Sequence, residues 1–270
     1  MKKAYIVICA ILLAGVVVFY AFSVPKSELK IGDTEIKRSS FHSTVFANDL
    51  AAKTKLKSSS NTPKAPAPPK KVDSGKVKMD TTKKTILFIG DSMVECLFPR
   101  MSAYAKKNGH TLYTVVWYSS TTEIYGTRTT LKDYINKYKP DYILFSLGGN
   151  ELFIKDIRQK RQKYVNELIR QMGNIPFVWI GPPNWKDDTG INDMINESVP
   201  AGCFYLSYTP DQHYNRKKDG AHPKADSSIL WMDRICKWIM TESAHPIRLV
   251  APPAGETARP DKLELLQPLR

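Results

Sequence analysis

The sequence predicts a doubly wound α/β domain over residues 85–240, in which helices cover both faces of a five-stranded parallel sheet. Two observations lead to this fold class. Five short segments are apolar throughout rather than alternating, which is typical of strands buried on both faces. Most of these segments are separated by a stretch whose apolar residues have helical spacing, which is the order of elements in a β-α-β chain.

The elements follow in order along the chain. The first strand is short and strongly apolar, and it ends at a Gly-Asp-Ser turn that precedes a helix containing Pro99. The longest helix is expected to begin at Leu152, because apolar residues recur at helical spacing from Phe153 to Met172. The expected strands are 86–89, 112–117, 142–147, 177–180 and 204–206, and the expected helices are 93–107, 131–138, 152–172 and 225–240. This order predicts a three-layer, flavodoxin-like arrangement.

Most of the positive charge lies outside the predicted domain. The chain has a net charge of +14, of which residues 1–84 carry +10 and the remaining residues carry +4. A basic groove on the folded domain is therefore not expected, and nucleic acid is not predicted as a partner.

Residues 1–24 are predicted to be a signal anchor that crosses the membrane as a helix. Lys2 and Lys3 precede an uncharged apolar run from Ala4 to Val24, long enough to span the hydrocarbon. Positive residues ahead of the run place the N-terminus in the cytoplasm, so the domain is expected outside it, in the periplasm or at the cell surface. Cleavage at Ala21-Phe22-Ser23 is the alternative, and the protein would then be secreted.

Two flanking segments are predicted to lack regular structure. Residues 25–84 are rich in Lys, Ser and Pro without sustained periodicity, so we expect a disordered linker. Residues 241–270 contain five prolines and balanced charge, and we expect an irregular tail.

Three short motifs fall at the carboxyl ends of predicted strands, where open parallel sheets bind ligands. The motifs are Gly90-Asp91-Ser92, Gly148-Gly149-Asn150-Glu151 and Asp219-Gly220-Ala221-His222-Pro223. Each is a weak signal alone, since such tripeptides occur in turns and Ser92 also fits a helix-capping box. In this order and spacing the three motifs resemble the SGNH, or GDSL, hydrolase family, and the resemblance covers residues 85–240 but neither flank.

The chemistry of acyl transfer assigns a role to each motif. A serine hydroxyl needs a base to take its proton, and a carboxylate orients and stabilises that base. The resemblance therefore implies Ser92 as nucleophile, His222 as general base and acid, and Asp219 as the orienting carboxylate. No cofactor is expected, and no metal is expected because no Cys or His cluster has ligand spacing. Of the four cysteines, Cys203 and Cys236 are expected to be buried thiols, with a disulfide as the alternative.

In the family, the oxyanion is held by the backbone N–H of the serine, by an N–H of the loop after the second strand and by the asparagine side chain. These donors correspond to Ser92 and Asn150, but the loop has no glycine at the aligned place, so Ser119 or Ser120 is expected to supply the remaining N–H, with Gly126 as the alternative. Glu151 stands where the family motif has aspartate, a difference that we expect to be tolerated.

Bulky side chains near the strand ends are candidates for substrate binding. Tyr118, Tyr125 and Trp185 could stack on sugar rings, as could Trp117, for which core packing is an equal alternative.

The expected function is an extracytoplasmic esterase that removes O-acetyl groups from carbohydrate or peptidoglycan through an acyl-serine. The alternatives are an O-acetyltransferase, a lipid esterase or thioesterase, and a non-catalytic envelope glycan-binding protein. We expect an O-acylated envelope substrate, contact with the membrane through the anchor, and a monomeric domain. An α/β-hydrolase is disfavoured because the serine lacks a Gly-x-Ser-x-Gly setting.

Overall fold

The computed structural model describes residues 29–31, 34–36, 78–209 and 213–269, in two compact units, Met1–Lys70 and Lys71–Arg270. The predicted anchor (1–24) and most of the predicted linker up to residue 77 lie outside the described residues. No helix within the described ranges is long and apolar enough to span a bilayer.

The residues described in the first unit form an antiparallel pair of strands, β1 (Leu29–Ile31) and β2 (Thr34–Ile36). The prediction of a structureless segment is wrong for these two strands. Leu29 and Ile31 flank Lys30, and Ile36 follows Glu35, so the pattern does alternate, but it is too short to stand out from the surrounding polar sequence.

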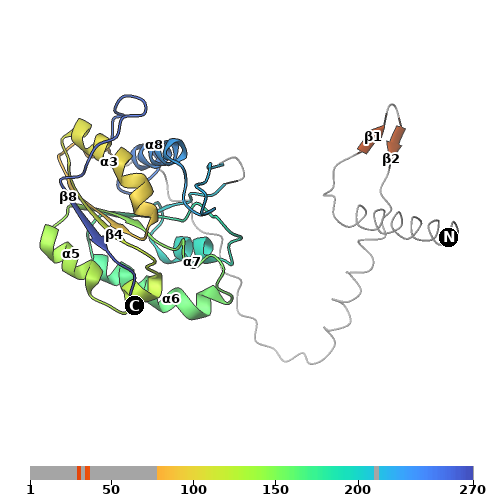
Figure 1. The fold of residues 1–270 in the computed structure, drawn as a ribbon, viewed down its shortest axis with the longest axis horizontal. Helices are drawn as coiled ribbons and strands as arrows, with labels where there is room; N and C mark the ends of the chain where they lie inside the picture. Colours follow the sequence, from red (N-terminus) through yellow and green to blue (C-terminus); the bar gives the residue numbers. More distant parts are fainter. Residues whose placement is uncertain (1–28, 32–33, 37–77, 210–212, 270) are drawn as a thin grey trace, which may run out of the picture. The chain divides into compact units, whose positions relative to one another are not determined.

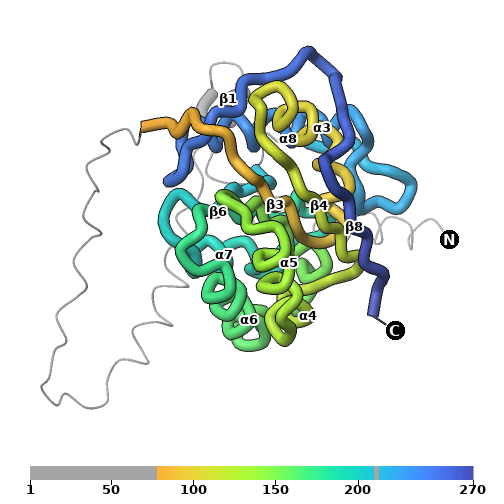
Figure 2. Tube along the Cα trace, turned by 90° about the vertical axis from the view of Figure 1, so that its left-hand side faces the viewer, coloured from red at the N-terminus to blue at the C-terminus, as the bar shows by residue number. Residues whose placement is uncertain are grey.

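The second unit is built on a six-stranded sheet in the order β7-β6-β5-β3-β4-β8, in which every neighbouring pair is parallel (Figures 1 and 2). The strands are β3 (Thr85–Gly90), β4 (Thr111–Trp117), β5 (Tyr142–Ser146), β6 (Phe177–Ile180), β7 (Phe204–Tyr205) and β8 (Lys262–Leu266). The first five strands have the flavodoxin-like order that the sequence predicts. The order of the strands reverses at the neighbouring pair β3 and β5, because β4 lies beside β3 on one side and β5 lies beside it on the other.

Helices cover both faces of this sheet, as predicted (Figure 1). One face carries α3 and α8, and the other carries α5, α6 and α7. The helices are α3 (Met93–Asn108), α4 (Thr122–Gly126), α5 (Thr130–Tyr138), α6 (Ile157–Met172), α7 (Ile191–Ser198) and α8 (Ala225–Thr241). The short helices α4 and α7 were not predicted, because each is too short for a clear period.

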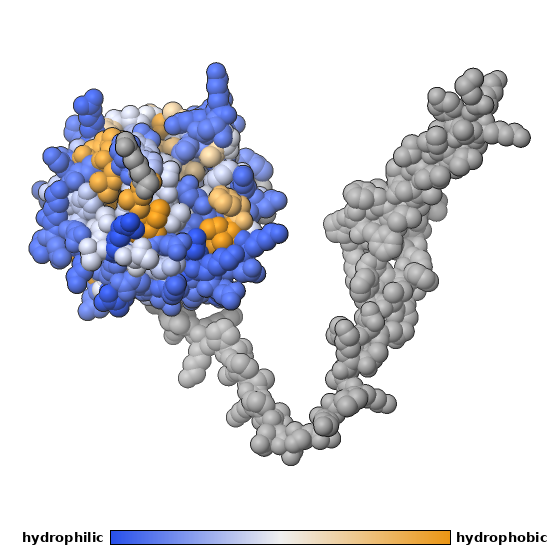
Figure 3. All heavy atoms as spheres, turned by 60° about the horizontal axis from the view of Figure 1, so that its bottom comes forward, coloured by the Kyte–Doolittle hydropathy of each residue, from blue (hydrophilic) through white to orange (hydrophobic). Residues whose placement is uncertain are grey.

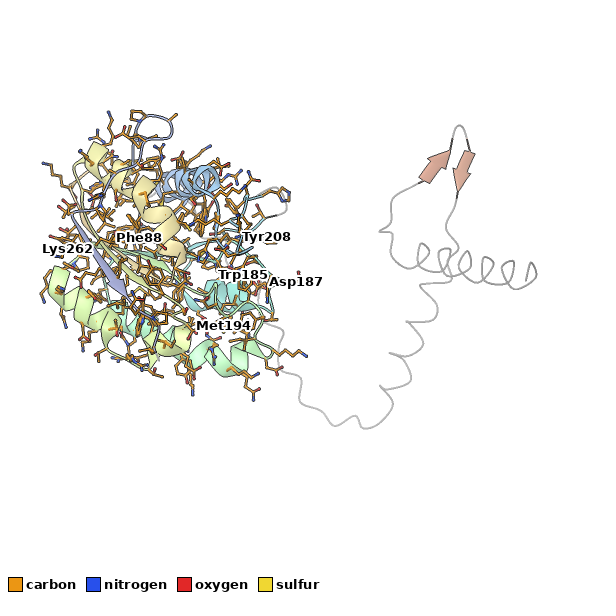
Figure 4. All side chains as sticks on the ribbon, viewed as in Figure 1. Phe88, Trp185, Asp187, Met194, Tyr208 and Lys262 are labelled. Atoms are coloured by element: carbon orange, nitrogen blue, oxygen red, sulfur yellow. The ribbon has the colours of Figure 1, made fainter. Side chains whose placement is uncertain are left out.

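The uniformly apolar strands supply two separate cores. In β3, Ile86 and Phe88 pack toward α3 and α8, whereas Leu87 and Ile89 pack toward the helices of the opposite face. Phe88 is visible in Figure 4 between the sheet and α3. Since successive side chains of a strand point to opposite faces, an apolar residue at every position is what a sheet covered on both sides requires.

The helix expected at 152–172 begins only at Ile157. Asp156 has φ 55°, a left-handed conformation that cannot continue an α-helix, and residues 152–156 form turns instead. Phe153, expected on the buried side of that helix, is 54% exposed. The helical spacing from Phe153 onward was therefore misleading at its first position.

The predicted irregular tail is in part a strand, which corrects both the five-strand prediction and the boundary at residue 240. β8 pairs in parallel with β4, with Leu265 opposite Val116. Arg100 of α3 fastens the chain before β8, since its guanidinium donates to the carbonyl oxygens of Pro253 (2.8 Å) and Glu256 (2.9 Å). β8 was missed because an edge strand is half solvated.

The fold also begins before Thr85. Asp80 pairs with the tail: its N–H donates to the carbonyl of Pro246 (2.8 Å), and its own carbonyl accepts from the N–H of Arg248 (2.9 Å).

The surface of this unit is mainly hydrophilic on the face drawn in Figure 3, with a few separate apolar areas. Cys203 and Cys236 are buried free thiols, so the alternative of a disulfide between them is excluded.

Candidate active site

The three motifs meet at the carboxyl edge of the sheet. Ser92 follows β3 and Asn150 follows β5, the adjacent strand, at the point where the order of strands reverses. Only glycine fits at position 90, because a Cβ atom there would lie 1.8 Å from the carbonyl oxygen of Ser146 in β5. This close approach brings the turns after β3 and β5 together.

Ser92, His222 and Asp219 form a continuous chain of hydrogen bonds. The Ser92 Oγ lies 2.8 Å from Nε2 of His222, and Nδ1 of the same ring lies 3.0 Å from Oδ2 of Asp219. In the tautomer that satisfies both bonds, Nδ1–H donates to the carboxylate and Nε2 accepts from the serine hydroxyl. The structure thus brings the three predicted residues together in the geometry of a nucleophile, a base and an orienting acid.

Two backbone groups hold the Asp219 carboxylate in place. Its Oδ1 accepts from the N–H groups of His222 (2.9 Å) and Ala221 (2.8 Å). These two bonds, with a smaller contribution from the His222 ring, lower the pKa of Asp219 to about 2. The carboxylate is therefore ionised at neutral pH, as a group that stabilises an imidazolium must be.

Arg216 supports the loop that carries His222. Its guanidinium donates to the carbonyl oxygen of Ala221 within that loop and to the carbonyls of Pro183 and Asn184 beyond β6. Because Arg donors are arranged in a rigid fork, one side chain can fix the two segments relative to each other.

Ser92 does not act as a helix cap. It adopts helical angles (φ −60°, ψ −16°) directly before α3, and its side chain makes no capping bond. Its hydroxyl is bonded to His222 instead. Among the described residues, none accepts a hydrogen bond from the Ser92 N–H, which lies at the positive end of α3.

Asn150 is in contact with the loop that carries the other candidate oxyanion donors, Ser119 and Ser120. Asn150 donates from Nδ2 to the carbonyl oxygen of Ser120 (2.8 Å), which leaves the second amide hydrogen for another acceptor. The N–H of Ser120 closes a turn by donating to Trp117 (3.2 Å), whereas no described residue accepts from the N–H of Ser119. Ser119 also has φ 57°, in the left-handed region that favours glycine. Gly126, the other candidate, instead lies in α4 against Tyr164.

The predicted substrate-binding residues separate into two groups. Tyr118 and Trp185 are half-buried at the edge of the core, and the indole N–H of Trp185 donates to the carbonyl of Gly149 (2.8 Å). Tyr125 is completely buried, and its hydroxyl donates to the carbonyl of Gly90 (3.3 Å). The prediction that Tyr125 binds substrate is therefore wrong, because its ring is part of the core. Trp117 is likewise buried.

Phe153 is an aromatic residue at this edge that the sequence analysis placed in the core. Its ring meets Trp185 edge-on at a centroid distance of 6.4 Å, and the Lys186 ammonium lies 4.9 Å from the Trp185 ring and 5.3 Å from the Phe153 ring. Figure 4 shows Trp185 with Asp187 at one end of the domain and Lys262 far from them. The exposure of Phe153 could have been predicted only if the start of α6 had been placed at Ile157.

The described part of the chain contains no group of three or more His, Cys, Asp or Glu side chains that could hold a metal ion.

No protein-family model and no curated protein matches the sequence. Several solved structures are similar to this chain. The esterase EstA from Pseudoalteromonas sp. is 16% identical over 57% of this chain and 96% of its own, with a TM-score of 0.43. TesA is 15% identical over 57% of this chain and 97% of its own, with a TM-score of 0.42. A protein from Desulfitobacterium hafniense described as lipolytic and of the G-D-S-L family is 13% identical over 57% of this chain and 98% of its own, with a TM-score of 0.38.

Proposed function

We propose that this chain is a serine esterase of the SGNH type that forms an acyl intermediate on Ser92. The observation that carries the proposal is the hydrogen-bonded chain from Ser92 through His222 to Asp219, with distances of 2.8 and 3.0 Å. A serine is a competent nucleophile when a base within hydrogen-bond reach takes its proton and a third group orients that base, and all three conditions are met here.

The first half of the reaction forms the acyl-serine. Ser92 Oγ attacks the carbonyl carbon of the ester while Nε2 of His222 takes the hydroxyl proton, and the carbonyl oxygen becomes an oxyanion. The oxyanion is stabilised by the Ser92 N–H, the Asn150 amide and the Ser119 N–H. When the tetrahedral species collapses, the bond to the alcohol oxygen breaks, and His222 returns its proton to the departing alcohol.

The second half releases the acid. Water gives a proton to His222 and attacks the acyl carbon, and the Ser92 oxygen leaves and regains that proton. The side chains of His222 and Asp219 are 27% and 48% exposed, so water has access to the base. This exposure favours hydrolysis over transfer of the acyl group to a sugar hydroxyl, which requires water to be kept away.

An O-acetylated carbohydrate of the cell envelope is the substrate class that we propose. Phe153 is 54% exposed and lies against the half-buried Trp185, which bonds Gly149 beside Asn150, and aromatic side chains of this kind suit the apolar faces of sugars. The extracytoplasmic location rests on the apolar run at residues 4–24, which lies outside the described residues.

The test compares the purified chain with its Ser92→Ala variant on an aryl acetate and on O-acetylated envelope glycans, with released acetate as the measurement. Acetate release from both substrates that disappears in Ser92→Ala is the expected result. No Ser92-dependent release from any ester would refute the esterase proposal. Acetate that accumulates on an added oligosaccharide instead of in solution would establish the transferase.

A further inference from the structure

Glu151, next to the oxyanion candidate Asn150, has a completely buried carboxylate. A carboxylate withdrawn from water is costly unless donors replace its hydration. Glu151 receives three such bonds. Oε2 accepts from the backbone N–H of Thr122 (2.7 Å), and Oε1 accepts from the hydroxyl of Thr122 (2.8 Å) and from Nε of Arg161 (2.7 Å).

The loop that Glu151 contacts carries the other candidate donor. Thr122 is the first residue of α4 and directly follows the segment containing Ser119. Asn150 holds the same segment at Ser120, through its bond of 2.8 Å. Two consecutive residues after β5 therefore bind the segment 118–122 at two points. The Asn150 amide binds Ser120, and the Glu151 carboxylate binds Thr122.

Arg161 of α6 fixes the carboxylate from the other side. Its Nε bonds Glu151, and its Nη2 lies 2.9 Å from Oε2 of Glu123 in α4. The carboxylate of Glu151 thus joins three elements, the end of β5, the start of α4 and the first half of α6.

We propose that Glu151 is a positioning residue of the acyl-transfer site: by holding Thr122 it sets the distance between the Ser119 N–H and the Asn150 amide, two of the three donors proposed for the oxyanion. This inference rests on the proposed function.

The length of the side chain matters to this role. Aspartate would be shorter by one carbon–carbon bond, about 1.5 Å, and could not keep both bonds to Thr122 unless residues 118–122 moved. Glutamate has the length that reaches both donors of Thr122 with the loop in this position.

The test measures kcat and KM for an aryl acetate with the full chain and its Glu151→Gln and Glu151→Asp variants. The oxyanion forms only as the tetrahedral species develops and is absent from the bound ester, so displaced donors lower kcat and leave KM little changed. Removing one such donor outright costs about 10²–10³ in kcat, and a displaced pair is expected to cost roughly tenfold or more. Glu123→Gln is the matched control, because it removes the other carboxylate on Arg161 without touching Ser120 or Thr122; its kcat should stay within about twofold of wild type.

A double-mutant cycle with Asn150→Ala separates positioning from a general loss of structure. If Glu151 positions this pair of donors, the double variant should lose less kcat than the product of the two single losses, because Asn150→Ala has already removed one of the two donors. Losses in kcat that multiply, a raised KM with wild-type kcat, or unchanged kinetics in Glu151→Gln would overturn the inference.

Thr122→Val covers the case in which the Glu151 variants do not fold. It removes one donor to Glu151 and keeps the shape of the side chain, so a smaller fall in kcat is expected, and a wild-type kcat would overturn the inference. If the wild-type chain shows no Ser92-dependent turnover, both proposals fail. If wild type is active and the Glu151 variants match it, only the positioning role fails.

Discussion

Replacing Asp91 with asparagine is expected to change how the stability of the domain depends on pH. Asp91 directly precedes Ser92 and is 1% exposed, and its Oδ1 accepts from the N–H of Met93 (2.9 Å). Burial raises the pKa of Asp91 from 3.8 to about 7; the charge of Glu151 adds to this, and the N–H groups of Met93 and Gly149 oppose it.

The size and sign of the effect follow from these values. The carboxyl group is neutral in the folded chain up to about pH 7 but ionises in the unfolded chain above pH 3.8. The contribution of Asp91 to the free energy of unfolding is therefore fully present below pH 3.8 and is lost as the pH rises toward 7, because the unfolded chain releases a proton that the folded chain keeps. At about 1.36 kcal/mol for each pH unit, the loss from Asp91 reaches ~4 kcal/mol by neutral pH.

Urea unfolding at pH 4 and pH 8, followed by tryptophan fluorescence, measures this loss. Asparagine keeps an acceptor for Met93 but has no proton to release. The free energy of unfolding of Asp91→Asn, relative to wild type, should thus be higher at pH 8 than at pH 4 by ~4 kcal/mol. Equal pH dependence in the two proteins would refute the assignment of a neutral Asp91.

Asp219→Asn is a control of opposite sign. The backbone N–H groups of His222 and Ala221 hold the pKa of Asp219 near 2, below its ordinary value of 3.8. Its contribution to stability is present above pH 3.8 and is lost as the pH falls through about 2, so wild type should weaken relative to this variant on the acid side only.

Three further predictions concern single side chains. Asn150→Ala should lower kcat by about 10²–10³ with KM little changed, measured on an aryl acetate, and an equal rise in KM would instead indicate ground-state binding. Tyr125→Phe should reduce the free energy of unfolding by about 1 kcal/mol, through the lost bond to Gly90, and leave kcat and KM unchanged; altered KM would restore Tyr125 as a substrate contact. Arg100→Ala should cost about 3 kcal/mol in urea unfolding, because it breaks a largely buried ion pair with Asp233 and frees the chain before β8; a loss below 1 kcal/mol would contradict that role.

The strands of the sheet centre could be predicted because burial on both faces leaves a plain signal, an unbroken apolar run such as Ile86 to Ile89. β8 could not. It lies at the edge of the sheet, where Leu263 and Leu265 stay partly exposed and alternate with Lys262 and Glu264, so its composition is that of a solvated tail.

The site divides in the same way. Ser92, Asp219 and His222 could be predicted together because each lies in a short motif next to a strand end or a helix start. The direction in which the Tyr125 side chain points could not be predicted, because an aromatic residue near a strand end has the same sequence signal whether it faces the core or solvent. The role of Glu151 depends on a contact with Thr122 across the sheet edge, and no local pattern encodes such a contact.

The position of β8 determines where the residues that follow it run. The N–H of Tyr118 donates to the carbonyl of Leu266 (3.0 Å), and the Trp117 indole donates to that of Gln267 (3.1 Å), so the last residues leave the sheet beside the loop that carries Ser119. A reporter domain joined after Gln267 would therefore stand next to the loop that carries Ser119. A fluorophore attached there would report on changes in this loop, and a bulky fusion would crowd it.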